Sequence, residues 1–448
     1  MEHKFLFLES LARTGEGFRA VPYLNGLLSN CEIDDALLTT SGIVYHSIGN
    51  FSLSEKFLKK AVALNPENDK ALYCLALLKV YQRNFREAVF YYEKAVKADF
   101  NRDDNLFGLL IGSRVYESSY NVALIKAHYE KLKSYYKRGE NRKGFLKYEK
   151  EVNLLNRING EQLFSTKIPE GKIELPIVDF NSDSFYKCLL LRVDDKEYKV
   201  LLDTGNAPGW TIHNPELIDS LSNYFGSKQS TSTGSVEHEF QSDSVIIEKI
   251  DFCGLKLFNL KGYYFKKPRE NYFDANLNPL FIRDYVVSID FINNKFILRT
   301  PEQFKKDLRE IEAALITKVP LYGDQWPFIP VKVNGYAEAL AMIETGAEDL
   351  SAKLEFAEFI HMPLTAATKE FRQKKYDYHK GKLEVMLGEF LFQRPEVEIW
   401  PKRFFDTECG LYDHIMIGPW ALEGNYILHI DPVKNEVILQ KSGKKAGT

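Results

Sequence analysis

The sequence predicts a chain in two parts, an all-helical first part and an all-β second part made of two similar lobes. Three observations predict this fold class. The hydrophobic pattern is helical to about residue 160 and then changes to short β-rich runs punctuated by Gly, Asn and Pro from about residue 170. The helical part is internally repetitive, and Ser54 and Ala88 are equivalent positions of two successive repeats. The β part repeats as well, and Asp203 and Glu344 are equivalent positions of its two copies.

Composition narrows the class of protein. The 448 residues are 45% hydrophobic and 27% charged, which is ordinary for a globular protein and excludes a disordered or collagen-like chain. The formal net charge of -3 gives no basic bias, so nucleic acid is not expected as a partner. No apolar run approaches the length of a membrane span, and the apolar stretch near Met1 is too short for a signal peptide. We therefore expect a soluble protein with no membrane partner. The five cysteines are scattered without CxxC spacing, which predicts the reducing environment of the cytoplasm.

The helical part carries a repeated pattern of small and large residues. The first set is Ser54, Leu58, Ala61 and Pro66. The second set follows at a constant spacing of 34 residues: Ala88, Tyr92, Ala95 and Phe100. Small residues at such places let two antiparallel helices approach closely. The spacing of the two sets resembles that of the tetratricopeptide repeat, a helix–turn–helix unit. We therefore expect residues 1–165 to form a tetratricopeptide-like helical repeat domain, with well-matched repeats at about 35–68 and 69–102 and a degenerate one before them.

The role of this helical domain stays open at the sequence level. A helical repeat must stack on neighbours and leaves a concave groove, which would dock a protein or peptide. Equally, the domain could be a structural spacer that packs on the second part of the chain, because the motif specifies a fold and not a ligand. The Lys- and Arg-rich stretch between Lys126 and Lys150 is interpreted as a solvated helix face, with a patch for an acidic partner as the alternative.

The β part is an internal duplication. The same offset relates segments at both ends of the unit: Asp203-Thr204-Gly205 and Glu344-Thr345-Gly346, residues 284–290 and 425–431, and residues 295–298 and 436–439. A shared offset at both ends is hard to obtain by chance. We expect lobe 1 over residues 166–300, a helical linker over 301–317, and lobe 2 over 318–448.

Each lobe opens with a predicted pair of strands that ends in an acidic residue. In lobe 2 the run from Phe328 to Val333 turns at Asn334-Gly335, the strongest short hairpin signal, and returns to Ile343. In lobe 1 the run from Phe185 to Val193 is followed by a second run that ends at Leu202. Each lobe thus presents one carboxylate at the tip of an apolar strand, followed by a threonine and a glycine. The linker helix is expected to begin at Thr300-Pro301 and to run to about Leu315.

These residues resemble those of the retropepsin-like and pepsin-like aspartic proteases. Three motifs carry the resemblance, which extends over the β part of the chain: Asp203-Thr204-Gly205-Asn206, Glu344-Thr345-Gly346-Ala347 and Ile415-Met416-Ile417-Gly418. The resemblance implies a bilobal, single-chain aspartic protease fold and an aspartic endopeptidase that needs no cofactor and no metal. Its substrate would be a protein or peptide, recruited by the helical domain. We expect a monomer.

The resemblance also implies a role for each motif residue. Asp203 and Glu344 would be the catalytic carboxylates, and two acids that share one proton can activate water and polarise a carbonyl. Thr204 and Thr345 would lock the two loops by reciprocal hydrogen bonds, while Gly205 and Gly346 would let the loops bend. Flaps are expected at residues 226–242 in lobe 1 and at about 376–388 in lobe 2. The second flap would turn at His379-Lys380-Gly381.

The sequence departs from the family pattern at three places. Glu344 stands where the family has Asp, Asn206 replaces a small residue, and the apolar-Gly element of lobe 1 has become Leu277-Asn278-Pro279-Leu280. A shift of the loop would restore the pairing of the acids. Otherwise the protein would be an inactive pseudo-protease that binds peptides or proteins. Pairing of two Asp203 loops in a homodimer is a third possibility, which the fused second lobe would obstruct.

Overall fold

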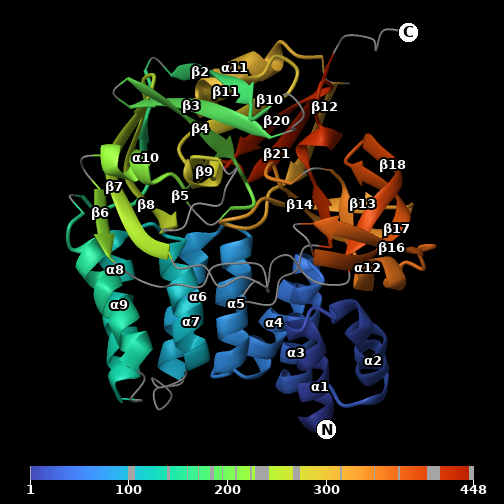
Figure 1. Ribbon diagram of the computed structural model, residues 1–448. Helices are drawn as coiled ribbons and strands as arrows, with labels where there is room; N and C mark the ends of the chain where they lie inside the picture. The colour runs from blue at the N-terminus through green and yellow to red at the C-terminus, as the bar shows by residue number, and fades with distance from the viewer. Residues whose placement is uncertain are drawn as a thin grey trace.

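In the computed structural model, most of the chain can be described. The described residues are 2–98, 106–138, 142–158, 160–169, 171–181, 186–193, 195–206, 209–221, 224–227, 242–265, 273–312, 315–347, 349–371, 374–400 and 414–442. A row of helices is followed by a β-rich region of mixed sheets, and the helices lie beneath both β lobes (Figure 1).

The first part folds as a succession of antiparallel helices. The helices are α1 (Glu2–Arg13), α2 (Gly17–Asn30), α3 (Asp35–Ser47), α4 (Phe51–Leu64), α5 (Asp69–Tyr81), α6 (Phe85–Ala98), α7 (Leu106–Glu117), α8 (Val122–Arg138) and α9 (Arg142–Leu155). Helices α3, α4 and α5 begin where the side chains of Asp34, Asn50 and Asn68 accept hydrogen bonds from free backbone amides of the first turn. Gly42 lets α3 and α4 approach, because a Cβ atom there would lie 2.4 Å from Leu58 Cγ.

Lobe 1 and lobe 2 repeat the same order of elements. Lobe 1 contains β3 (Lys187–Val193), β4 (Lys196–Leu202), β5 (Trp210–Ile212), α10 (Pro215–Ser220), β6 (Tyr224–Ser227), β7 (Ser242–Phe252), β8 (Leu255–Phe265), β9 (Ala275–Leu277), η1 (Pro279–Phe281), β10 (Val286–Asp290) and β11 (Lys295–Arg299). Lobe 2 contains β13 (Phe328–Val333), β14 (Tyr336–Ile343), β15 (Ser351–Lys353), α12 (Leu354–Phe359), β16 (Thr365–Phe371), β17 (Lys374–Leu387), β18 (Phe390–Trp400), β19 (Ile415–Ile417), η3 (Pro419–Ala421), β20 (Tyr426–Asp431) and β21 (Glu436–Lys441).

Strand pairing repeats as well. In lobe 1, β9 lies parallel to β4 and antiparallel to β5, and β5 lies parallel to β8. In lobe 2, β19 has the same relation to β14 and β15, and β15 lies parallel to β18. The short strand β1 (Ser165–Lys167) adds to lobe 1 by pairing with β8. The duplication predicted from the constant sequence offset therefore appears as two lobes with matching topology.

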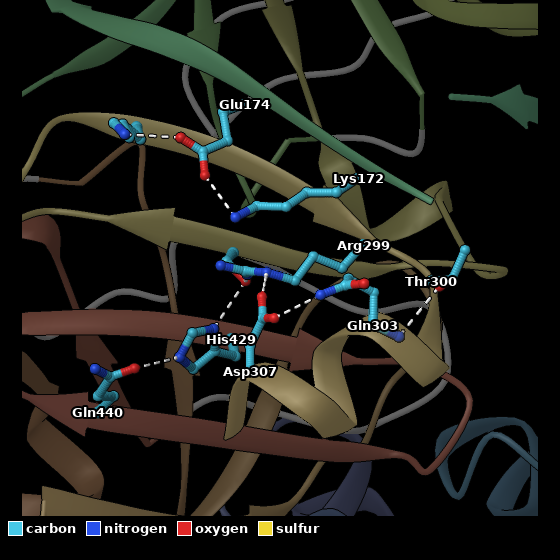
Figure 2. Close-up of polar contacts among 10 residues, drawn as sticks. Lys172, Glu174, Arg299, Thr300, Gln303, Asp307, His429 and Gln440 are labelled. Atoms are coloured by element: carbon cyan, nitrogen blue, oxygen red, sulfur yellow. Dashed lines mark hydrogen bonds and ion pairs between the residues drawn. The ribbon is translucent and has the colours of Figure 1, made fainter. Parts of the chain in front are cut away.

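The lobes join through a shared stretch of sheet with the strand order β12-β21-β20-β10-β11-β2, where β2 is Lys172–Asp179 and β12 is Ile316–Pro320. At its centre, Ser288 pairs with His429, its counterpart in the other lobe, so a pseudo-twofold axis passes between them. Ser288 Oγ lies 2.8 Å from His429 Nδ1. Arg299 donates to Ser288 Oγ at 2.9 Å and pairs with Asp307 of the linker helix α11 (Pro301–Arg309) at 2.6 Å, in the network shown in Figure 2.

The helical part packs against both lobes. On lobe 2, Phe18 of α2 stacks on Phe359 with ring centroids 4.5 Å apart, and a Cβ atom at Gly49 would meet Leu340. On lobe 1, Glu151 of α9 accepts a hydrogen bond from Ser244 at 2.7 Å and pairs with Lys261 at 3.0 Å. The helices thus form one layer that spans both lobes (Figure 1).

The two predicted repeats bury their first helices almost completely. In α5, most side chains from Ala71 to Tyr81 are buried, including Lys79, and α3 is similarly enclosed. One side of these helices packs on α4 and α6. The other side packs on the β region, where Leu38 of α3 and Tyr81 of α5, together with Phe51 at the start of α4, share a cluster with Leu340 and Met342. The inner face of these repeats is therefore covered by the same chain.

Two expectations about local structure were wrong. The predicted turn at His379-Lys380-Gly381 does not exist, because β17 runs through these residues and pairs with β16 and β18. Gly381 instead lies at a register irregularity, where a Cβ atom would meet Met362 Sδ at 2.7 Å. The linker helix is shorter than predicted, since α11 ends at Arg309 and not near Leu315. Of the lobe 1 flap over residues 226–242, all but the flanking ends lies outside the described residues.

Candidate active site

Asp203 and Glu344 follow equivalent strands at equivalent points. Asp203 comes directly after β4, and its amide donates to Leu277 O of β9 at 3.0 Å. Glu344 comes directly after β14, and its amide donates to Ile417 O of β19 at 3.0 Å. Each acid is thus held at the end of a parallel pair of strands in its own lobe, and both are almost completely buried.

Two threonines cross-link the loops that carry the acids. These are residues 203–206, here named the first acidic loop, and residues 344–347, the second acidic loop. The Thr204 amide donates to Thr345 Oγ1 at 3.0 Å, and the Thr345 amide donates to Thr204 Oγ1 at 3.0 Å. Each hydroxyl also donates to the opposite lobe, Thr204 to Ile343 O at 2.6 Å and Thr345 to Leu202 O at 2.7 Å. Both threonines are fully buried, so these bonds do not compete with water. The reciprocal pattern fixes the two loops against each other around the pseudo-twofold axis.

Each carboxylate lies against the glycine of the other loop. A Cβ atom on Gly205 would lie 1.9 Å from Glu344 Oε1, and one on Gly346 would lie 2.5 Å from Asp203 Oδ1. No side chain larger than a hydrogen atom fits at either glycine without displacing a carboxylate. The structure therefore brings together all six residues that the sequence singled out: Asp203, Thr204, Gly205, Glu344, Thr345 and Gly346.

The surroundings of Asp203 set its protonation. Burial raises the pKa of Asp203 above its ordinary value, while hydrogen bonds from Glu344, the Gly205 amide and Asn276 favour the ionised form and offset part of that effect. The Gly205 amide donates to Oδ1 at 3.1 Å, and Asn276 Nδ2 donates to Oδ2 at 2.9 Å. A proton shared between Asp203 and Glu344, the acidic pair, is therefore retained to a higher pH than on an exposed aspartate.

Two asparagines of lobe 1 contact the first acidic loop: Asn276 was missed in the sequence, and Asn278 was noted only as a departure from the family pattern. Asn276 occupies the place in β9 that Met416 occupies in β19, and Asn278 occupies that of Gly418 just before the short helix. The counterpart of residues 415–418 in lobe 1 is therefore 275–278 and not 277–280 as predicted, because β9 pairs with β4 in the register in which β19 pairs with β14. Asn278 Nδ2 donates to Asn206 O at 2.9 Å, which holds the end of the first acidic loop. Aligning lobe 1 on lobe 2 by strand order would have revealed both positions.

Trp326 was also missed. Its Nε1 donates to Gly205 O at 3.0 Å, although the tryptophan precedes the lobe 2 hairpin and the glycine belongs to lobe 1. No sequence pattern signals a contact of this kind, because it joins segments of the two lobes that no repeat relates. Another tryptophan, Trp210, is a buried core residue of lobe 1, and its ring lies against that of Phe252, with ring centroids 5.7 Å apart.

The described residues show neither a metal centre nor a membrane span. Among them, no three His, Cys, Asp or Glu side chains gather as a metal ion would require. In the same part of the chain, no helix combines the length and apolar character needed to cross a bilayer.

Comparison with known proteins identifies the helical repeats. The tetratricopeptide repeat matches residues 36–68 and 69–102, which confirms the two predicted repeats and corresponds to helices α3 to α6. No curated protein matches the chain.

Proposed function

We propose that the chain is an aspartic-type endopeptidase whose acidic pair, Asp203 and Glu344, activates a water molecule for peptide hydrolysis. The observation that carries the proposal is the meeting of two buried carboxylates across a pseudo-twofold axis, on loops locked by the reciprocal bonds of Thr204 and Thr345. Two acids in such a site cannot both ionise at low cost, so one supplies a base and the other a proton donor.

The chemistry requires only one shared proton. The ionised carboxylate takes a proton from water as the water oxygen attacks the carbonyl carbon, and the protonated acid donates to the carbonyl oxygen. The resulting geminal diol then gives a proton back to a carboxylate. The carbon–nitrogen bond breaks as the departing nitrogen takes the other proton, which releases an acid and an amine and returns the pair to its starting state.

The longer side chain of Glu344 is compatible with this proposal. Its carboxylate reaches closer to the opposite glycine than that of Asp203, since a Cβ atom on Gly205 would lie 2.0 Å from Glu344 Cδ and one on Gly346 would lie 2.6 Å from Asp203 Cγ. The extra methylene therefore extends across the axis toward the other loop. This contact supports a pair made of one aspartate and one glutamate.

A peptide library incubated across a range of pH tests the proposal. We expect the wild-type chain to cleave peptides, Asp203→Ala to abolish cleavage, and Glu344→Asp to retain or raise it. Unfolding curves for each variant serve as the control for folding. If the wild type cleaves no peptide, the endopeptidase proposal fails, whether or not Glu344→Asp cleaves one.

A second candidate function is protein binding without cleavage. Two matched tetratricopeptide repeats favour it, because such repeats generally mediate contacts between proteins. Since the inner face of these repeats is covered by the β region, a partner would meet the outer helices α4 and α6, where Leu64 and Phe90 are exposed. Cleavage by Glu344→Asp but not by the wild type would favour this function.

A further inference from the structure

The segment that leads into lobe 2 contacts both the helical part and the first acidic loop. Residues 322–326, here named the linking segment, lie between β12 and β13. The linking segment belongs to lobe 2 in sequence, but its side chains and carbonyls bond to the helical part on one side and to the Asp203 loop on the other.

The helical part holds the linking segment through a buried carboxylate. Asp324 is 1% exposed, and it pairs with Arg114 of α7 at 2.6 Å and accepts a hydrogen bond from Ser118. The neighbouring Gly323 bonds to α5 and the turn that follows it, because its amide donates to Tyr81 O at 2.7 Å and its carbonyl accepts from Arg83 at 2.8 Å. A buried carboxylate is held firmly only while its cation is present.

The other side of the linking segment holds the first acidic loop. Trp326 Nε1 donates to Gly205 O at 3.0 Å, and Gln325 O accepts from Asn278 Nδ2 at 2.8 Å. The same amide group of Asn278 donates to Asn206 O at 2.9 Å. Gly205 is the residue against which the Glu344 carboxylate packs, so its position decides how closely the two acids approach.

Arg114 contacts both ends of this connection. Besides its ion pair with Asp324, its guanidinium lies over the Trp326 ring, 5.4 Å from the centroid. Arg114 therefore fixes the indole whose N–H bonds to Gly205, although it belongs to the helical part and not to the lobes that carry the acids.

We propose that Arg114 is a positioning residue for the acidic pair, and that the helical part acts on hydrolysis through the linking segment. This inference rests on the proposed endopeptidase function. It gives the helical part a role within the enzyme itself, since displacement of α7 from the lobes would release Trp326 and loosen the Gly205 loop.

The test compares variants of the full chain in two measurements. Arg114→Ala and Trp326→Phe remove the two ends of the connection, and Arg114→Lys restores a charge without the planar group. The matched control is Arg19→Ala, which breaks an exposed ion pair of 3.0 Å between the helical part and Glu358 of lobe 2. The measurements are kcat and KM on a cleaved peptide, and hydrogen exchange of the amides of residues 203–206.

We expect Arg114→Ala and Trp326→Phe to lower kcat by about 10- to 100-fold with little change in KM, because the loop is displaced but the peptide still binds. Arg114→Lys should recover part of the loss, and Arg19→Ala should stay within about twofold of the wild type. Amide exchange at residues 203–206 should become faster in the first two variants only. A folded Trp326→Phe variant with wild-type kcat and wild-type exchange would overturn the inference.

The exchange measurement separates this inference from the proposed function. If the wild type cleaves no peptide, the endopeptidase proposal fails, and exchange at residues 203–206 still decides whether Arg114 and Trp326 position the loop. Faster exchange in the Arg19→Ala control to the same degree would show a general loosening of the helical part and would contradict the inference.

Discussion

At the scale of single residues, the acidic pair depends on glycines as much as on acids. Gly205 and Gly346 each occupy the space directly beside the opposite carboxylate, where any Cβ atom would clash. Their loops meet at a distance that only glycine permits, so these positions tie the geometry of the site to residues that carry no chemistry of their own.

A Gly205→Ala substitution tests this dependence. The new methyl group would lie 1.9 Å from Glu344 Oε1 without a shift, so we expect the acids to separate and cleavage to fall by about 100-fold or more. Gly26→Ala is the matched control, because nothing lies within 4 Å of a Cβ atom there, and it should stabilise α2 by up to about 1 kcal/mol. Peptide cleavage and thermal unfolding measure the two effects. Full activity in Gly205→Ala would contradict the described packing.

Asn276 tunes the protonation of Asp203. Its hydrogen bond to Oδ2 favours the ionised carboxylate and so lowers the pKa of Asp203, which burial raises overall. In Asn276→Ala the pKa of Asp203 should therefore rise further, and the acid limb of the pH–rate profile should move to higher pH. Asn50→Ala, which removes a helix cap distant in sequence from the acids, should leave the limb unchanged. An acid limb that stays in place in Asn276→Ala would rule out this role.

At the scale of elements, the antiparallel pairing of β10 with β20 joins the lobes, and β20 carries a buried histidine. His429 lies beside Ser288 on the pseudo-twofold axis, and burial lowers its pKa to about 4. His46, on α3, has its pKa lowered to about 4 for the same reason. Both imidazoles are therefore neutral in the folded protein at mildly acidic pH, whereas in the unfolded chain they become charged below about pH 6.5.

The free energy of unfolding should consequently fall as the pH falls. Between about pH 7 and about pH 5 these histidines bind protons in the unfolded chain but not in the folded protein. The free energy of unfolding therefore falls by roughly 2 kcal/mol for each histidine. Urea unfolding at the two pH values measures the loss. His429→Gln keeps a polar group beside Ser288 and should show a smaller loss than the wild type. An equal loss in the variant would show that His429 does not contribute.

The elements also show how far sequence can predict this structure. The strands around Asn334-Gly335 and the repeat offset led directly to Glu344 and to its partner loop, because periodicity and turn chemistry are local signals. The turn predicted at His379-Lys380-Gly381 was wrong, because Gly381 suits a turn and close packing equally well. Trp326 could not be found, since its bond to Gly205 joins segments of the two lobes that no repeat relates. Arg114 could not be found, since its ion pair with Asp324 depends on how the helical part docks onto the β region.

At the scale of the whole molecule, the helical layer and the lobes share a core. Leu340 and Met342 of β14 lie in the same apolar cluster as Leu38, Phe51 and Tyr81 of the helices, close to the strand end that carries Glu344. The tetratricopeptide repeats thus pack within their own chain. A module usually associated with external partners here covers one face of lobe 2.

Leu340→Asp tests the shared core. Leu340 is 2% exposed, and a carboxylate buried there without a partner should lower the free energy of unfolding by at least about 3 kcal/mol. Leu391→Asp is the matched control, because Leu391 is 47% exposed and its substitution should cost less than about 0.5 kcal/mol. Urea unfolding followed by circular dichroism gives both values. Similar stability of the two variants would mean that the helical layer does not pack on β14 in solution.

The pH dependence of kcat/KM for wild-type cleavage of one peptide, measured beside Asp203→Ala, tests most directly whether the two acids work as a pair. If Asp203 and Glu344 share a single proton across the pseudo-twofold axis, the wild-type profile should be bell-shaped, with one limb for loss of the base and one for loss of the acid, and Asp203→Ala should be inactive at every pH. Cleavage that persists in Asp203→Ala, or a wild-type rate that does not change with pH, would contradict it.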